Sequence, residues 1–177
     1  KVFVHCFLDG RDTPPTSGVE YLAQLEEKLR ETGVGKIASV TGRYYAMDRD
    51  KRWERVQEAY DIIVSGKGTT ALSAEECIKK SYDAAKTDEF VLPTAIIDEA
   101  GKPVGTVKDK DSIIFFNFRP DRAREITRTF CDAEFDGFER KNAPKDIVFV
   151  CFTEYDVTIE NKLVAFKPQR LTNTLGE

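Results

Sequence analysis

Apolar residues along this chain alternate between short continuous runs and longer stretches in which they recur every three or four positions. Continuous runs are typical of buried β-strands, whereas the wider spacing predicts helices with one apolar face. Strands are expected at 2–8, 36–41, 112–118 and 147–152, and helices at about 17–33, 51–64, 73–85 and 121–130. This alternation predicts an α/β fold with a mainly parallel sheet flanked by helices.

Local signals mark several helix boundaries. Thr16 or Ser17 can act as the N-cap of the first helix, and Ser73 with Glu76 has the spacing of a capping box. Pro120 favours a helix that starts directly after it, because the first helical turn tolerates a missing N–H. These residues divide the chain into compact strand and helix units.

Two further stretches have weaker patterns. Residues 90–98 and 101–107 predict a β-hairpin that turns near residues 99–101, as a small appendage to the sheet. Residues 160–177 have no clear period and are expected to be irregular chain. The main domain is therefore expected to span residues 1–159.

Arginine and aspartate stand together directly after three of the predicted strands. The strings are Leu8-Asp9-Gly10-Arg11-Asp12, Gly42-Arg43-Tyr44-Tyr45-Ala46-Met47-Asp48-Arg49-Asp50 and Asn117-Phe118-Arg119-Pro120-Asp121-Arg122. In parallel sheets, ligands bind beyond the carboxyl ends of the strands. A guanidinium holds a carboxylate or phosphate through two hydrogen bonds. The pattern predicts a site for a small anion at this edge.

The third string has a functional and a structural interpretation. At a strand-to-helix junction, free N–H groups and the helix dipole would add to the positive potential of Arg119 and Arg122. Alternatively, these two arginines only pair with Asp121 or with carboxylates at the sheet edge. The same two interpretations remain open for Arg43 and Arg49.

Asp12 is the candidate for proton chemistry in the first string. It stands beside Arg11, so one cation can hold an anion while the carboxylate accepts or delivers a hydroxyl proton. The neighbouring arginine favours the ionised carboxylate, which suits a base or a hydroxyl-binding group. Asp9 has a simpler structural use, because it can cap the turn at Gly10.

His5 and Cys6 suggest a competing function, the phosphate-binding loop of cysteine-dependent phosphatases. That loop places five residues between Cys and Arg, whereas four separate Cys6 from Arg11, and Asp9 would put negative charge where phosphate should bind. His5 is the only histidine and lies inside a predicted strand. A multi-histidine metal centre or a Ser-His-Asp triad is therefore not indicated, and no metal site is expected in this chain.

Composition narrows the classes of function. The chain has 177 residues, 41% of them hydrophobic, which is enough for one sizeable core. A net charge of -4 without a dense basic stripe argues against nucleic-acid binding. The chain has no apolar run of about 20 residues and no leader pattern, so no membrane association and a cytoplasmic location are expected. Four scattered cysteines fit reduced thiols.

Taken together, the three strings closely resemble the signatures of the bisphosphoglycerate-independent phosphoglycerate mutases, in the same order. The matching segments are Phe7 to Asp12, Gly42 to Trp53 and Phe116 to Arg122, and the similarity runs through nearly the whole chain. The resemblance implies a two-domain glycolytic enzyme that interconverts 3-phosphoglycerate and 2-phosphoglycerate. One domain is similar to alkaline phosphatase and carries two Mn²⁺ ions and a nucleophilic serine. The other domain binds the substrate.

The resemblance also assigns roles within this chain. It implies that the substrate-binding residues are Arg11, Asp12, Arg43, Arg49, Arg119 and Arg122, and that Asp12 handles the proton of the glycerate hydroxyl. Residues 1–159 would be an N-terminally truncated substrate-binding (phosphotransferase) domain, and 160–177 a linker to the phosphatase-like domain. That missing domain would hold the serine and both manganese ions. A substrate-contacting histidine of the family would lie upstream and is not His5.

Two functions from different classes therefore remain in view. In the first, the chain is the substrate-gripping domain of a phosphoglycerate mutase and is inactive by itself. In the second, it is a non-catalytic module that binds phosphate, carboxylate or a protein partner. The effect of Asp12→Asn on turnover, compared with its effect on affinity, distinguishes the two.

Overall fold

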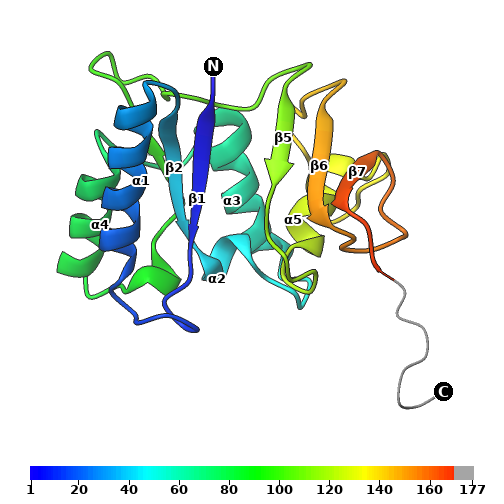
Figure 1. The fold of residues 1–177 in the computed structure, drawn as a ribbon, viewed down its shortest axis with the longest axis horizontal. Coiled ribbons are helices and arrows are strands. Elements are labelled where there is room, and N and C mark those ends of the chain that lie inside the picture. The colour runs from blue at the N-terminus through cyan, green and yellow to red at the C-terminus, as the bar shows by residue number, and fades with distance from the viewer. Residues whose placement is uncertain (170–177) are drawn as a thin grey trace.

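The computed structural model describes residues 1–169 and has the expected α/β architecture (Figure 1). Its elements are β1 (Phe3–Leu8), α1 (Gly18–Thr32), β2 (Lys36–Gly42), α2 (Arg43–Ala46), α3 (Trp53–Ser65), β3 (Thr69–Ala71), α4 (Ala74–Asp83), the 3-10 turn η1 (Asp88–Phe90), β4 (Thr94–Ile96), β5 (Ser112–Phe115), α5 (Arg124–Cys131), β6 (Val148–Thr153) and β7 (Lys162–Phe166). Within the described residues, no helix is long and apolar enough to cross a bilayer.

The strands form two sheets. The first has the order β1-β2-β4-β3 and the second the order β5-β6-β7. All neighbouring strands are parallel except β2 and β4. This confirms the prediction of a mainly parallel arrangement, although the strands are divided between two sheets. Figure 1 shows β1 and β5 running in the same direction, with the loops that follow them on the same side of the molecule.

Helices and aromatic residues join the two sheets. Helices α1 and α4 pack on each other and on β2, whereas α3 packs on β2, β4 and α5. Phe7 of β1 meets Phe115 of β5 edge to face, with ring centroids 5.9 Å apart. Tyr60 of α3 lies 5.0 Å from Phe130 of α5 by the same measure. These contacts fix the end of β5 relative to the ends of β1 and β2.

The two expected helix caps differ in how they form. Ser73 caps α4 as predicted, because its hydroxyl oxygen accepts a hydrogen bond from the Glu76 N–H at 3.1 Å. Ser17 precedes α1, but its hydroxyl donates to the Pro14 carbonyl and does not cap the helix. The buried Asp88 carboxylate takes that role and accepts the Gly18 N–H at 2.7 Å. The first turn of α1 is thus capped by a residue that lies 70 positions away in the sequence.

The hairpin prediction is only partly correct. The segment forms β4, which lies inside the four-stranded sheet between β2 and β3 and is not an appendage. The returning arm is reduced to a single antiparallel bridge between Ile97 and Pro103. The short strand β3 was not predicted at all. Proline at 103 has no N–H to donate, so it does not extend a ladder there.

The prediction of irregular chain after residue 160 is wrong for residues 162–166. These residues form β7, which pairs in parallel with β6. The run is only five residues long, which is too short for its pattern to separate a strand from a loop. Residues 170–177 of the predicted linker lie outside the described residues, and the domain boundary at 159 stays a prediction.

The end of β5 also differs from the prediction. The strand stops at Phe115, three residues earlier than expected, and α5 starts at Arg124 and not directly after Pro120. The Tyr155 side chain holds the backbone between them. Its hydroxyl forms hydrogen bonds to the carbonyl oxygens of Phe115, at 2.8 Å, and Asn117, at 2.7 Å. The result is an extended turn that presents Arg119 and Arg122.

Candidate functional site

The loop after β1 is organised by Asp9. One carboxylate oxygen of Asp9 accepts the backbone N–H groups of Arg11 and Asp12, each at 3.2 Å. This confirms the predicted turn-capping use of Asp9. Gly10 has a φ of +65°, and a Cβ at this position would lie 2.7 Å from the Asp88 Cβ. The tight turn therefore depends on glycine and directs the side chains of Arg11 and Asp12 outward.

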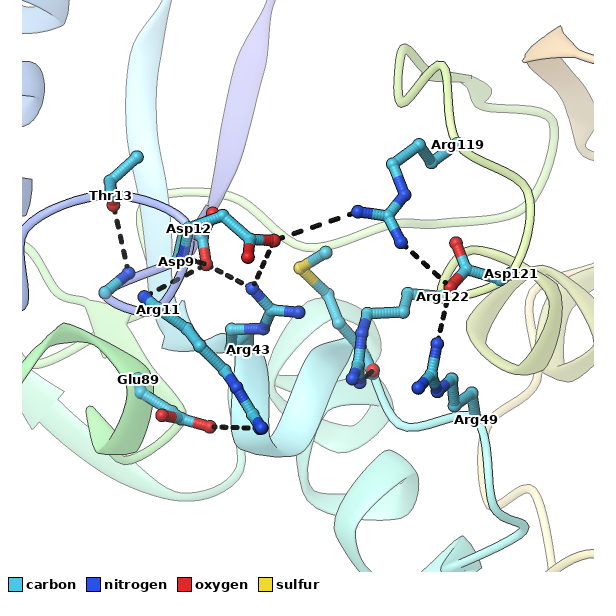
Figure 2. Close-up of polar contacts among 12 residues, drawn as sticks. Asp9, Arg11, Asp12, Thr13, Arg43, Arg49, Glu89, Arg119, Asp121 and Arg122 are labelled. Carbon is cyan, nitrogen blue, oxygen red and sulfur yellow. Dashed lines mark hydrogen bonds and ion pairs between the residues drawn. The ribbon is translucent and has the colours of Figure 1, made fainter.

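Arg43 lies beneath this loop, at the start of α2, a short helix that was not among the predicted elements. Its side chain is 5% exposed, and its guanidinium donates to both Asp9 and Asp12, the latter at 3.1 Å (Figure 2). Burial by itself would lower the pKa of Arg43, but its contacts with these two carboxylates raise it. The same contact lowers the pKa of Asp9, against the opposing effect of burial. The three residues form a fixed, charged base for the site.

Two further arginines meet at Asp121. One oxygen of this carboxylate accepts from Arg49 at 2.8 Å and from Arg119 at 3.2 Å. Burial would raise the pKa of Asp121, but the two guanidinium groups lower it overall. Arg119 also lies 3.8 Å from the Asp12 carboxylate. Figure 2 shows Arg119 between Asp12 and Asp121, so the first and third strings are in contact.

Arg122 occupies the middle of the cluster. Its guanidinium donates to the Met47 carbonyl at 2.8 Å. The pKa of Arg122 is lowered, first by burial and then by the positive charges of Arg43, Arg49 and Arg11. This shift indicates that the arginines of all three strings share one local field. A ligand with several negative charges would relieve their mutual repulsion.

Arg11 lies on the outer side of the site. Its side chain is largely exposed, and its guanidinium is 3.6 Å from the Glu89 carboxylate of η1. The structure thus brings all six predicted residues, Arg11, Asp12, Arg43, Arg49, Arg119 and Arg122, to one edge of the fold. No pattern in the sequence indicated Glu89, which comes from a distant segment. The direct contact of Asp9 with Arg43 was not predicted either.

A cleft of about 440 Å³ adjoins this cluster. Arg49 and Asp121 line it, whereas Arg11, Asp12 and Arg43 do not. The cleft is open and lined by both acidic and basic side chains. The charged cluster itself lies on a surface, where a second protein segment can cover it.

Burial argues against the cysteine-dependent alternative. The pKa of the Cys6 thiol is raised to about 12, mainly by burial and also by the charge of Glu26. A thiol in that state is a poor nucleophile near neutral pH. His5 is partly buried, with its Nδ1 2.8 Å from the Ser39 hydroxyl, and desolvation lowers its pKa to about 4. Near neutral pH, these values favour the uncharged imidazole and the uncharged thiol.

Comparisons with known proteins identify the family of this chain. Residues 1–157 match the family model described as "BPG-independent PGAM N-terminus". The chain is 60% identical over 177 residues to a 2,3-bisphosphoglycerate-independent phosphoglycerate mutase of Clostridium novyi, spanning 100% of this chain and 34% of the relative. The enzyme of the same name from Acetivibrio thermocellus is 60% identical over 176 residues, covering 99% of this chain and 34% of its own length.

A solved structure shows the same fold. The crystal structure of Leishmania mexicana phosphoglycerate mutase, described as determined at low cobalt concentration, superimposes with a TM-score of 0.85 at 34% sequence identity. The match covers 97% of this chain and 33% of that protein. This chain therefore spans about a third of the length of the proteins that it matches. On the family model and these identities, the chain belongs to the family of 2,3-bisphosphoglycerate-independent phosphoglycerate mutases, as part of their N-terminal region.

Proposed function

We propose that this chain is the substrate-gripping part of an enzyme that interconverts 3-phosphoglycerate and 2-phosphoglycerate. The observation that supports this most strongly is that the three strings meet at two carboxylates: Asp12 contacts Arg43 and Arg119, and Asp121 contacts Arg49 and Arg119. Phosphoglycerate carries a phosphate and a carboxylate, so it needs several fixed cations. Guanidinium groups match both anions through paired hydrogen bonds.

Asp12 is the proposed catalytic residue. Its side chain is 62% exposed, so its carboxylate is open to a bound ligand, whereas Arg43 holds it from below. In this position it can accept the proton of a glycerate hydroxyl when that oxygen takes up the phosphoryl group. In the opposite direction it returns the proton to the departing oxygen.

The proposal divides the reaction between two parts of a longer protein. A serine outside this chain takes the phosphoryl group, and the arginines keep glycerate in place while it reorients. Holding glycerate makes the return transfer effectively intramolecular, which supplies a large part of the rate enhancement. The partner of this chain is therefore the phosphatase-like domain of the same protein, and a cytoplasmic, glycolytic role follows from the substrate.

The two manganese ions of the proposal belong to that other domain. Among residues 1–169, no three His, Cys, Asp or Glu side chains are grouped to hold a metal ion. The described residues thus do not fit a dinuclear metal centre, and no step assigned to this chain passes through one. Manganese would supply Lewis-acid chemistry at the phosphoryl group where it binds.

The test is an activity measurement on the full-length protein that contains this chain. Conversion of 3-phosphoglycerate to 2-phosphoglycerate is measured with Mn²⁺ present and bisphosphoglycerate rigorously absent. We expect turnover under these conditions. A folded, metal-loaded protein with no turnover would contradict the proposal and leave a binding module as the better description.

A further inference from the structure

Glu125, in the first turn of α5, is an ionisable side chain that the proposed reaction does not use. It is only 7% exposed. One of its carboxyl oxygens accepts the Lys51 N–H at 2.8 Å. The other, Oε2, is buried and receives no hydrogen bond from any described residue. A carboxylate oxygen buried without a donor is costly, which indicates that this oxygen carries a proton.

Asp48 accepts the N–H groups on either side of Lys51, so the carboxyl groups of Asp48 and Glu125 bind consecutive N–H groups of one loop, and Asp48 is the natural acceptor for that proton. It is 4% exposed, and its carboxylate accepts the N–H groups of Asp50 at 2.9 Å and Arg52 at 3.0 Å. The Arg52 guanidinium adds a contact at 2.8 Å. Burial would raise the pKa of Asp48, but these donors lower it. Asp48 is therefore held as the ionised member of the pair.

Only one of the two carboxyl groups, that of Asp48 or that of Glu125, can be ionised at a time. Burial raises the pKa of Glu125, and the neighbouring Asp48 carboxylate raises it further, against the opposing effect of the Lys51 N–H. Two adjacent buried carboxylates repel each other strongly, so the second keeps its proton. The neutral acid can donate to Asp48 and accept from Lys51 at the same time.

The hydrogen bond from the Lys51 N–H to Glu125 lies between two parts of the arginine cluster. We define the Arg49 loop as residues 47–52, which connect α2 to α3. Asp48 and Lys51 flank Arg49 in this loop, and Glu125 follows Arg122 by three positions. Lys51 has a φ of +59°, a left-handed conformation that a non-glycine residue adopts only where its surroundings hold it.

We propose that Glu125, as a neutral carboxylic acid, is a positioning residue that joins the Arg49 loop to the turn carrying Arg119 and Arg122 by donating to Asp48. The inference rests on the proposed function of these arginines as substrate ligands. Glu125 does not itself contact substrate. It acts through the placement of Arg49, which must face Arg119 across Asp121.

Charged groups surround the pair on every side. Asp50, Arg52 and Arg55 approach it from the loop and α3, with Arg55 3.8 Å from Asp48. Arg49, Asp121, Arg124 and Arg128 line the same cleft as Glu125. The arginines of the cleft have other partners: Arg49 binds Asp121, Arg124 donates to the Tyr155 carbonyl, and Arg128 binds Asp132 and Asp156. They are not placed to neutralise an ionised Glu125.

The protonation of Glu125 sets the direction in which stability and substrate binding change with pH. The folded state holds the Glu125 proton more tightly than the unfolded chain does. The stabilisation that this proton provides is therefore complete at low pH and is lost as pH rises through the folded-state pKa of Glu125. Loss of the proton puts two buried carboxylates side by side and loosens the Arg49 loop. Substrate binding should therefore weaken on the alkaline side.

The experiment compares Glu125→Gln and Glu125→Ala in the full-length protein. Glutamine preserves the neutral donor and acceptor, so we expect KM for 3-phosphoglycerate to stay within about twofold at neutral pH and to lose its alkaline rise. Alanine leaves Lys51 and Asp48 without this partner, and we expect KM to rise about tenfold, with a smaller change in kcat. Asp61→Asn is the matched control, because burial also raises the pKa of Asp61, on α3, but Asp61 is not paired with any arginine of the site.

Two readouts do not depend on turnover. The infrared carbonyl band of a protonated carboxylic acid should be present in the wild type and absent in Glu125→Gln. Hydrogen exchange of the Lys51 amide should accelerate in Glu125→Ala but not in Asp61→Asn. An absent band, or the same alkaline rise of KM in Glu125→Gln, overturns the inference. A wild type without mutase activity refutes the proposed function instead, and the band and the amide exchange still decide the state of Glu125.

Discussion

Arg43 donates to Asp12 at 3.1 Å from a buried position, while the Asp12 side chain itself remains mostly exposed. The cation is fixed and the carboxylate is accessible. An arginine placed in this way orients the Asp12 carboxylate without blocking its approach to a ligand. The contact therefore explains how one residue can be both held in place and available for proton transfer.

Replacing Asp12 by asparagine should separate chemistry from binding. Asparagine keeps the size and can still hydrogen-bond a hydroxyl, but it cannot take the proton. We expect kcat of the full-length protein to fall by roughly 10²- to 10⁴-fold with KM changed by much less. Steady-state kinetics with 3-phosphoglycerate make this measurement. A loss that appeared only in affinity would favour the non-catalytic binding module.

Arg43→Lys should be a severe change despite keeping the charge. A lysine ammonium cannot reproduce the planar guanidinium that contacts Asp9 and Asp12 together. We expect substrate affinity to fall about tenfold and the free energy of unfolding to fall by about 1–3 kcal/mol, because a buried contact is lost. Calorimetric binding and denaturant unfolding measure the two effects. Arg30→Lys, at an exposed ion pair 3.9 Å long, is the control and should change neither.

Gly10→Ala should destabilise the loop after β1 more than a glycine substitution elsewhere. The new Cβ would lie 2.7 Å from both the Asp88 Cβ and the Glu89 nitrogen, at a φ of +65°. Gly33→Ala is the matched control, since its φ is +67° but nothing lies within 4 Å of the added atom. We expect about 1 kcal/mol of destabilisation at Gly33 and at least twice that at Gly10. Equal losses would show that conformation alone, and not crowding, requires Gly10.

Asp156 should make stability sensitive to acid. Hydrogen bonds from Thr158, with a further contribution from Arg128, lower its pKa to about 2. The stabilising contribution is therefore present above the unfolded-state value of about 3.9 and is lost as pH falls toward 2. We expect Asp156→Asn to be less stable than the wild type at neutral pH, with the difference shrinking in acid. Urea unfolding at several pH values tests this, and a difference that stayed constant between neutral pH and pH 2 would count against it.

The parts of the fold that depend on local pattern were predictable. The apolar run that ends at Leu8 and the spacing around Val56 required no distant partner, so their strand and helix were assigned correctly. The gathering of these arginines at one edge was predictable for the same reason, because each string keeps its arginines within a few positions of a strand end. Figure 2 shows the arginines of the three strings close to one another.

The contacts that were missed all join residues far apart in the chain. Asp88 caps the first turn of α1 from 70 positions away in the sequence. Glu125 accepts the Lys51 N–H from 74 positions away. Nothing near either acid in the sequence indicates its partner. The strand β7 was missed because its five residues become a strand only by pairing with β6. Short sheets and buried acids depend on tertiary context, which a local pattern does not contain.

The crowding of positive charge around Arg122 has a consequence for the lifetime of the folded protein. Without a ligand, Arg43, Arg49 and Arg11 all disfavour the charged form of Arg122. A bound polyanion removes that repulsion in the native state only, so folding and ligand occupancy are thermodynamically linked. At a ligand concentration 100 times Kd, this linkage adds about 2.7 kcal/mol to the free energy of unfolding. The concentration of the anionic ligand would then govern how long the folded protein survives proteolysis.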